Sequence, residues 1–217
     1  TRNDGTGADA GHVRVYQYDA SSPAETDQSS VDFGPLGWKR LGHDIDGENT
    51  DDRSGESVSL SSDGTIVALG SYYHNSNAGH IRVYQYSSSD VSWNQLGSDI
   101  DGETEADTSG YSVSLNSDGT RVAVGGYGYS NYKGIVDIYE YSTPGSTGGT
   151  WNKMGSSITG SSGDYLGYSV ALNSDGTKVV FSATGTDVNQ SWSGSIHVYE
   201  YSSNAWSQVG SQIDGTT

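Results

Sequence analysis

The chain has 217 residues, with 27 Asp and Glu against 10 Lys and Arg, and its formal net charge is -17. This charge disfavours nucleic acid and anionic membrane surfaces as partners, because both are polyanions. The sequence has no cysteine, which excludes disulfides and thiolate metal sites, and no apolar run long enough for membrane insertion. It begins at Thr1 without a signal-peptide pattern, so we expect a processed chain or a piece of a longer protein.

The first predicted elements lie in residues 11–46, which we call the half unit. Two segments there are rich in β-branched and aromatic residues, as strands are: GHVRVYQY (11–18) and WKRLGHDIDG (38–47). An insertion at 19–37 separates them. Three longer repeats follow at about 54–101, 109–159 and 165–214, which we call the first, second and third units.

Each complete unit carries four short phrases in a fixed order. An S-V-x-L phrase precedes D-G-T with an apolar run, then comes a phrase that ends in Y-x-Y, and the last phrase starts with Trp. The repeat is marked by four tryptophans at spacings of 55, 58 and 55 residues: Trp38, Trp93, Trp151 and Trp206. The half unit holds only the last two phrases. The sequence therefore predicts that it forms outer strands without the inner hairpin.

An Asp-Gly pair joins the first two phrases of each unit, at residues 63–64, 118–119 and 175–176. This pair favours a two-residue hairpin turn of type I′, in which both central residues have positive φ. We therefore expect a tight hairpin with such a turn in every unit. No segment sustains the 3.6-residue apolar period of a helix.

These features predict an all-β fold, namely a β-propeller built from four-stranded antiparallel blades of about 55 residues. Residues 1–217 would form one partial propeller domain with three complete blades and an outer half-blade. Apolar side chains on both faces of the third phrase support this, because a blade is covered on both sides: Ile81 and Val83 on one face, Tyr84 and Tyr86 on the other. A β-solenoid is the alternative, although its repeats are usually shorter and lack Asp-Gly hairpins.

The repeated phrases resemble the FG-GAP-like repeats of integrin-α-type β-propellers, over nearly the whole chain apart from the insertion at 19–37. The form found in large surface and secreted proteins of marine microbes and algae is the most similar. Residues 55–57, 110–112 and 167–169 stand at the "FG" position, and residues 69–71 and 124–126 at the "GAP" position, from which residues 181–183 depart. The resemblance implies an extracellular or cell-surface protein with a structural or adhesive role.

Three and a half blades do not close a ring, since propellers typically have four to eight. The chain could belong to a longer array, a partner could supply the missing hairpin, or open strand edges could join end to end. We therefore expect other protein chains or further repeats as partners, within a larger surface protein or a filament.

Two acidic loops are candidates for calcium, because they place carboxylates at alternate positions and Ca²⁺ takes six to eight oxygen ligands. The candidate ligands are Asp44, Asp46, Glu48, Asp52, Asp99, Asp101, Glu103 and Asp107. The third unit has lost most of these acids, and the D-x-D-x-D-G spacing of integrin-type calcium loops is absent. Solvated turns are the alternative. We expect no other cofactor.

Variable loops follow the second phrase of each unit at 71–77, 126–133 and 184–194 and should gather on one face of a propeller. They carry aromatic residues suited to sugars or to a protein surface: Tyr72, Tyr73, Tyr127, Tyr129, Tyr132 and Trp192. A glycan- or protein-binding lectin-like module is therefore the alternative function. Asn189 opens the N-x-S match of the third loop, which predicts a glycosylation site and a glycoprotein if the chain is secreted.

We find no catalytic constellation in the sequence. The arginines are scattered over different repeat positions, no H-E-x-x-H or G-x-S-x-G motif occurs, and His12 and His80 occupy one repeat position that suggests a structural role. We therefore expect a non-enzymatic extracellular structural or adhesive segment, with a hydrolase as the least favoured option.

Overall fold

The computed structural model describes residues 7–27, 30, 34–186 and 192–215. Over these residues the protein is all-β, with antiparallel sheets and two four-residue helical segments, α1 (His74–Asn77) and α2 (Tyr129–Tyr132). The sequence predicts no helix. Each segment is a single turn with left-handed φ angles in its middle, so no 3.6-residue apolar period could reveal it.

Each complete unit forms one antiparallel sheet of five strands. The first unit contains β5 (Ser57–Leu60), β6 (Ile66–Ser71), β7 (His80–Ser87), β8 (Ser92–Gln95) and β9 (Ile100–Asp101). The second contains β10 (Ser112–Leu115), β11 (Arg121–Gly126), β12 (Ile135–Tyr141), β13 (Trp151–Lys153) and β14 (Ile158–Thr159). The third contains β15 (Leu166–Leu172), β16 (Lys178–Ala183), β17 (Ser195–Ser202), β18 (Ala205–Gln208) and β19 (Ile213–Asp214).

The fourth position of each sheet is shared by two short strands. In the first unit, β8 pairs with the second half of β7 and β9 pairs with its beginning, with His80 opposite Asp101 and Tyr86 opposite Trp93. The same arrangement recurs in the second and third units. Four strand positions therefore hold five strands, because the Trp phrase bends away between its two paired segments.

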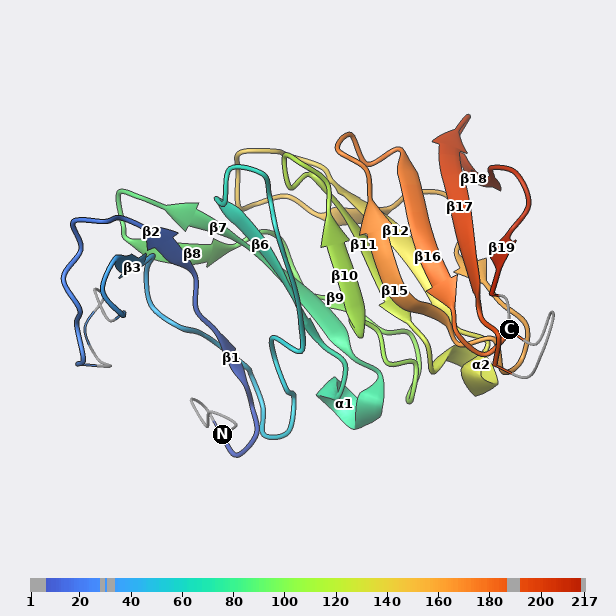
Figure 1. The fold of residues 1–217 in the computed structure, drawn as a ribbon, viewed down its shortest axis with the longest axis horizontal. Helices are drawn as coiled ribbons and strands as arrows, with labels where there is room; N and C mark the ends of the chain where they lie inside the picture. The colour runs from blue at the N-terminus through green and yellow to red at the C-terminus, as the bar shows by residue number, and fades with distance from the viewer. Residues whose placement is uncertain (1–6, 28–29, 31–33, 187–191, 216–217) are drawn as a thin grey trace.

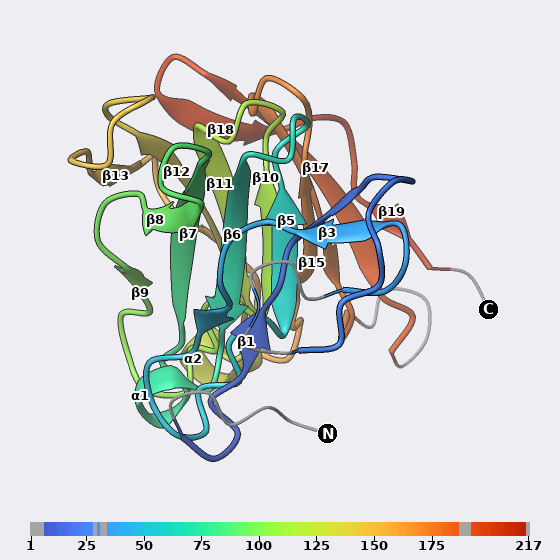
Figure 2. The same ribbon diagram turned by 90° about the vertical axis from the view of Figure 1, so that its left-hand side faces the viewer.

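The half unit forms two small sheets. β2 (Tyr16–Tyr18) pairs with β3 (Trp38–Arg40), and β1 (His12–Val13) pairs with β4 (Ile45–Asp46). Tyr18 lies opposite Trp38, as Tyr86 lies opposite Trp93. These strands correspond to the two outer positions of a complete unit, and the described residues of the half unit contain no inner hairpin. Figure 2 shows β1 and β3 in front of the strands of the first unit.

The Asp-Gly turns differ from the prediction in one respect. Gly64, Gly119 and Gly176 have positive φ, but the preceding aspartates do not, so the turns are not of type I′. In the first unit, the Asp63 carboxylate accepts hydrogen bonds from the Thr65 N–H and hydroxyl and from the Ser61 hydroxyl. These bonds hold a longer turn in which only the glycine needs the left-handed region.

The hydrophobic core lies between consecutive sheets. Ile81, Val83 and Leu96 of the first unit pack against Val113 and Leu115 of the second. The second and third units enclose a matching cluster with Val136, Ile138 and Phe181, and the half unit covers the other face of the first unit. Each interior sheet is thus buried on both faces, as the apolar residues on both sides of its strands predict.

Polar contacts repeat at the same places between units. An inner-strand serine hydroxyl accepts from the backbone of the next inner strand, Ser59 from Leu115 N and Ser114 from Leu172 N. A Trp indole N–H donates to the preceding unit in three cases: Trp93 to Leu41, Trp151 to Leu96 and Trp206 to Met154. In Figure 1 the sheets follow one another along the long axis, and α1 and α2 lie on the same edge.

Candidate functional site

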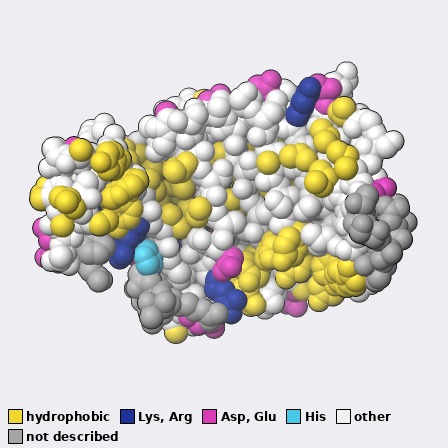
Figure 3. All heavy atoms as spheres, in the orientation of Figure 1, with side chains coloured by type: hydrophobic (Ala, Val, Ile, Leu, Met, Phe, Trp, Pro, Cys, Tyr) yellow, Lys and Arg dark blue, Asp and Glu magenta, His cyan; other side chains and the backbone are white. Residues whose placement is uncertain are grey.

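A connected group of aromatic rings lies on the edge of the molecule that carries α1 and α2, and we call it the tyrosine cluster. It contains seven tyrosines and one tryptophan with successive ring centroids 4.5–6.1 Å apart: Tyr72, Tyr73, Tyr111, Tyr127, Tyr132, Tyr165, Tyr168 and Trp192. The rings come from all three complete units. Figure 3 shows hydrophobic side chains gathered along the lower right of the molecule, the side on which α2 lies in Figure 1.

The structure joins five of the six aromatic residues proposed from the sequence. Tyr129 has no ring contact with the others among the described residues. Sequence reasoning missed Tyr111, Tyr165 and Tyr168, which precede or open the inner strands. The recurrence of Gly-Tyr-Ser at 110–112 and 167–169 is the signal that could have found two of them.

Neighbouring rings and charge set the properties of this cluster. Burial raises the pKa of Tyr111, and its neighbour Tyr168 raises it further. Arg53 lies 3.9 Å from the ring centre of Tyr73, a cation–π contact. Tyr132, Tyr168 and Trp192 are exposed. The cluster thus offers neutral phenol groups and aromatic faces to a ligand, with one cation at its edge.

The proposed calcium ligands do not converge on one point. Asp44 is held by Arg14 at 2.7 Å and Arg40 at 2.8 Å. Asp52 and Asp107 are buried and accept hydrogen bonds from loop backbone N–H groups, of Asn49 and Thr104 respectively. Glu48 faces Arg82 and Glu103 faces Lys153. Asp46, at the end of β4, lies opposite His12.

Asp99 and Asp101 are two of the calcium candidates that lie beside another possible metal ligand. Their carboxylates lie with the imidazole of His80, each offering one ligand atom within 4.8 Å of the others. Glu48, His74 and His80 form a second group by the same measure. Both groups include His80, which the sequence had suggested was structural.

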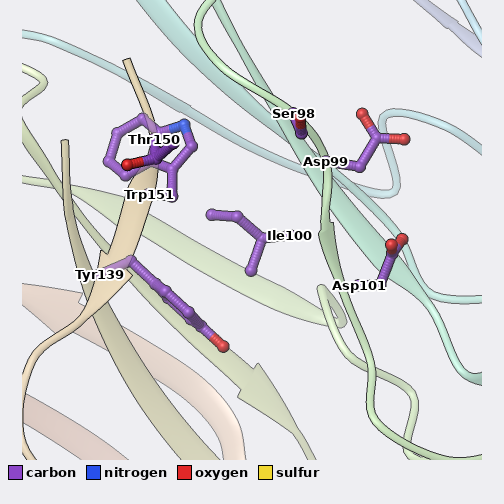
Figure 4. A pocket seen from close by; sticks show the side chains of 7 residues that line it. All are labelled: Ser98, Asp99, Ile100, Asp101, Tyr139, Thr150 and Trp151. Atoms are coloured by element: carbon purple, nitrogen blue, oxygen red, sulfur yellow. The ribbon is translucent and has the colours of Figure 1, made fainter. Parts of the chain in front are cut away.

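A pocket of about 330 Å³ lies between the outer strands of the first and second units. It is lined by Ser98, Asp99, Ile100, Asp101, Tyr139, Thr150 and Trp151. Figure 4 shows Ile100 between the two aromatic side chains and the aspartates, with the carboxylates of Asp99 and Asp101 projecting away from Tyr139 and Trp151. The pocket therefore presents an apolar wall, and the two carboxylates point away from its aromatic side chains.

The two end faces expose positions that are buried inside the molecule. Ile213 of the third unit is 63% exposed, whereas Ile100 and Ile158 at the same repeat position are 5% and 7% exposed. On the opposite face Val58 is 54% exposed, against 8% for Val113. Further residues follow the same pattern: Val180, Ile196 and Val209 on the third unit, and Leu60 on the first.

The third unit differs in sequence from the other two units at the inner end of its exposed face. Gly125 approaches the carbonyl of Gly167 so closely that an added Cβ would lie 2.1 Å from that oxygen, and Gly70 meets Gly110 in the same way. Ser182 occupies this position in the third unit, so a neighbour cannot approach as closely there. Ala171 also replaces the accepting serines Ser59 and Ser114.

Asn189 and its predicted glycosylation lie outside the described residues. Within the described part of the chain, no helix is long and apolar enough to cross a membrane.

Comparisons with known proteins support the fold alone. No protein family and no curated protein matches the sequence. The structure is similar to that of Sqt1 from Chaetomium thermophilum, with a TM-score of 0.50 and 16% identity over 74% of this chain and 36% of that one. Hydrazine synthase from Kuenenia stuttgartiensis gives a TM-score of 0.44 and 12% identity, over 77% and 39% of the two chains. The chain thus spans well under two thirds of either neighbour, and its fold is β-propeller-like.

Proposed function

We propose that the chain is a non-enzymatic structural segment of an extracellular β-propeller, built from three blades and an outer half-blade, which is held in a larger assembly through its end faces. The occupant we assign to each face is a further repeat unit of the same kind. This unit lies beyond these 217 residues in the same polypeptide or belongs to a second copy. The resemblance of the repeats to surface and secreted proteins supports the extracellular and adhesive setting.

The observation that carries this proposal is the change in exposure at equivalent positions. Isoleucine at the Ile100 position is buried wherever a following unit exists and exposed in the third unit. On the other face, Val58 is exposed, whereas Val113 at the same repeat position is buried. Burying such side chains contributes about 1.5–3 kcal/mol each, so these faces favour a neighbour that continues the existing interfaces.

Two measurements test the proposal together. The intact mass of the natural polypeptide, after deglycosylation, shows whether the neighbour is in the same chain, since the 217 residues account for 22.9 kDa. Sedimentation of the 217-residue chain over a range of concentrations shows whether the open faces bind each other. We expect association that Ile213→Glu abolishes and that Val91→Glu, an exposed loop residue of the first unit, leaves intact. A natural mass near 22.9 kDa combined with a monomer at every concentration would contradict the proposal.

A second function, recognition of a glycan or of a protein surface, is favoured by the tyrosine cluster. The exposed rings of Tyr132 and Trp192 both contact the half-buried ring of Tyr165, and aromatic faces stack on sugars and anchor protein interfaces. A glycan array, probed with and without Ca²⁺, tests it. We expect binding that weakens in Tyr132→Ala and persists in Tyr18→Ala, an exposed tyrosine outside the cluster. An array without any bound glycan would leave a protein surface as the ligand class, to be sought by the same pair of variants.

A further inference from the structure

One buried side chain in the first unit has no hydrogen-bond partner. His80 is fully buried at the start of β7, and neither of its ring nitrogens has a hydrogen bond among the described residues. A buried polar group normally has a partner, because without one it loses its hydration and gains no hydrogen bond in exchange. The imidazole is therefore placed for a partner that protein atoms do not supply.

Two carboxylates face this imidazole from the neighbouring outer strand. β9 pairs with the start of β7, and His80 lies opposite Asp101. Asp99 and Asp101 are two residues apart and so project to the same side of the strand, opposite to the buried Ile100. The Asp99 Oδ2 is 3.6 Å from the His80 Nδ1, and one ligand atom from each of the three residues lies within 4.8 Å of the others.

The distance between His80 and Asp99 is close to the spacing of two ligands on a metal ion. Zinc binds nitrogen and oxygen ligands at about 2.0–2.2 Å, so two tetrahedral ligands lie about 3.4 Å apart. The 3.6 Å separation of Nδ1 and Oδ2 needs little adjustment. The imidazole of His80 is fully buried, and burial disfavours its charged form, so the neutral form that can coordinate a metal ion is favoured.

In the half unit, the carboxylate at the repeat position of Asp99 is neutralised by arginines. Asp44 corresponds to Asp99, and there Arg14 and Arg40 both bind the carboxylate. In the first unit, the Asp99 carboxylate contacts His80 and accepts a hydrogen bond of 2.6 Å from the neutral side-chain amide of Gln95. Arg82 of the same unit donates instead to the Asp46 carbonyl of the half unit and to the Ser54 hydroxyl at the start of the first unit. Among the described residues, Asp99 and Asp101 of the first unit thus form no ion pair with an arginine.

We propose that His80, Asp99 and Asp101 bind a divalent transition-metal ion of the Zn²⁺ type. An imidazole with two carboxylates suits zinc better than calcium, which prefers oxygen ligands alone. The ion would join β7 to β9 and so fix the outer edge of the first unit. The rival set of Glu48, His74 and His80 is less available, since His74 Nδ1 lies 3.1 Å from Asp52 and Glu48 lies 3.5 Å from Arg82.

The experiment is calorimetric titration of the chelator-treated chain with ZnCl₂, with CaCl₂ in parallel. Thermal unfolding with and without zinc gives a second readout, because a ligand that binds only the folded state stabilises it. We expect one zinc per chain, a raised melting temperature and no comparable effect of calcium. Asp101→Asn, on an exposed residue, should weaken zinc binding at least about 10-fold. Asp214→Asn, at the same position of the third unit, should leave it unchanged.

Three results would overturn the proposal. These are the absence of zinc binding, equal weakening by Asp101→Asn and Asp214→Asn, or loss of binding in His74→Asn with full binding in Asp101→Asn. The last result would assign the ion to the rival set. His80→Gln should also abolish binding, but because it changes a buried residue, its folding has to be checked by circular dichroism, and the exposed Asp101 carries the decision.

Discussion

The indole Nε1 of Trp151 donates a hydrogen bond of 2.8 Å to the carbonyl oxygen of Leu96, across the boundary between the first and second units. Trp93 and Trp206 make the same bond to the units before them. Each complete unit therefore forms a hydrogen bond to the preceding unit at the outer edge. This bond adds to the apolar core between the two sheets.

Replacing Trp151 by Phe keeps an aromatic ring and removes the donor. We expect a loss of about 1–2 kcal/mol in the free energy of unfolding, from the hydrogen bond and some buried area. The matched control is Trp38→Phe, since Trp38 occupies the same position in the half unit and is exposed. Urea unfolding measures both. Equal losses would show that the bond to Leu96 contributes nothing specific.

Gly125→Ala tests the close approach of the second and third units. The new Cβ would lie 2.1 Å from the Gly167 carbonyl oxygen, so the two sheets must separate. We expect destabilisation by about 1–3 kcal/mol, as for overpacked cores. Gly148→Ala is the control, because its nearest neighbouring atom would be 3.9 Å away. A fully stable Gly125→Ala variant would show that the interface can yield without cost.

The Asp63 turn predicts a loss of stability in acid. Hydrogen bonds from the Ser61 hydroxyl and then from Thr65 lower the pKa of Asp63 in the folded chain. Its charged form therefore favours folding above the unfolded pKa of about 3.9, and this contribution is lost as the pH falls through the folded pKa. Asp63→Asn should be less stable than the parent at pH 6 and approach it below about pH 4. Asp51→Asn, an exposed loop change of the same charge, should show no such convergence.

The tyrosine cluster predicts a loss of stability in alkali. Burial raises the pKa of Tyr111 and of Tyr127, and neighbouring tyrosines raise both further. The contribution is complete below the unfolded pKa of about 10 and is lost as the pH rises through the folded values. Tyr111→Phe keeps the ring but removes the ionising group, so its stability should fall less steeply above pH 10. Tyr18→Phe, outside the cluster, is the control, and identical curves for all three proteins would exclude the effect.

The strands and their order could be predicted because their signals are local. Alternating Val, Ile and Tyr define the strands, and the recurrence of Trp defines the repeat. Apolar residues on both strand faces, such as Ile81 and Tyr84, predict sheets covered on both sides. The turn type could not be predicted, because it depends on how the Asp63 carboxylate bonds to its neighbours.

The candidate sites were harder to predict because they join residues distant in the sequence. Tyr72 and Tyr111 are brought together only when two units stack, and the ring of Tyr165 meets Tyr132 and Trp192 through separate loops. His80 and Asp101 become neighbours through the pairing of β7 with β9. A repeat position shared with His12 suggested only a structural histidine, since the sequence does not show which carboxylates arginines neutralise.

In the proposed assembly, Ser182 would make the joint at the third unit different from the joints within the chain. Copies of the first or second unit would bury the exposed isoleucines of the third unit. At the inner end, however, the Ser182 side chain would sterically prevent their close approach. Only a neighbouring unit with more space beside Ser182 could pack fully against the third unit. This joint would therefore discriminate among units that otherwise share one sequence pattern. A serine in place of a glycine would thereby restrict which repeat unit of the proposed assembly can pack against the third unit.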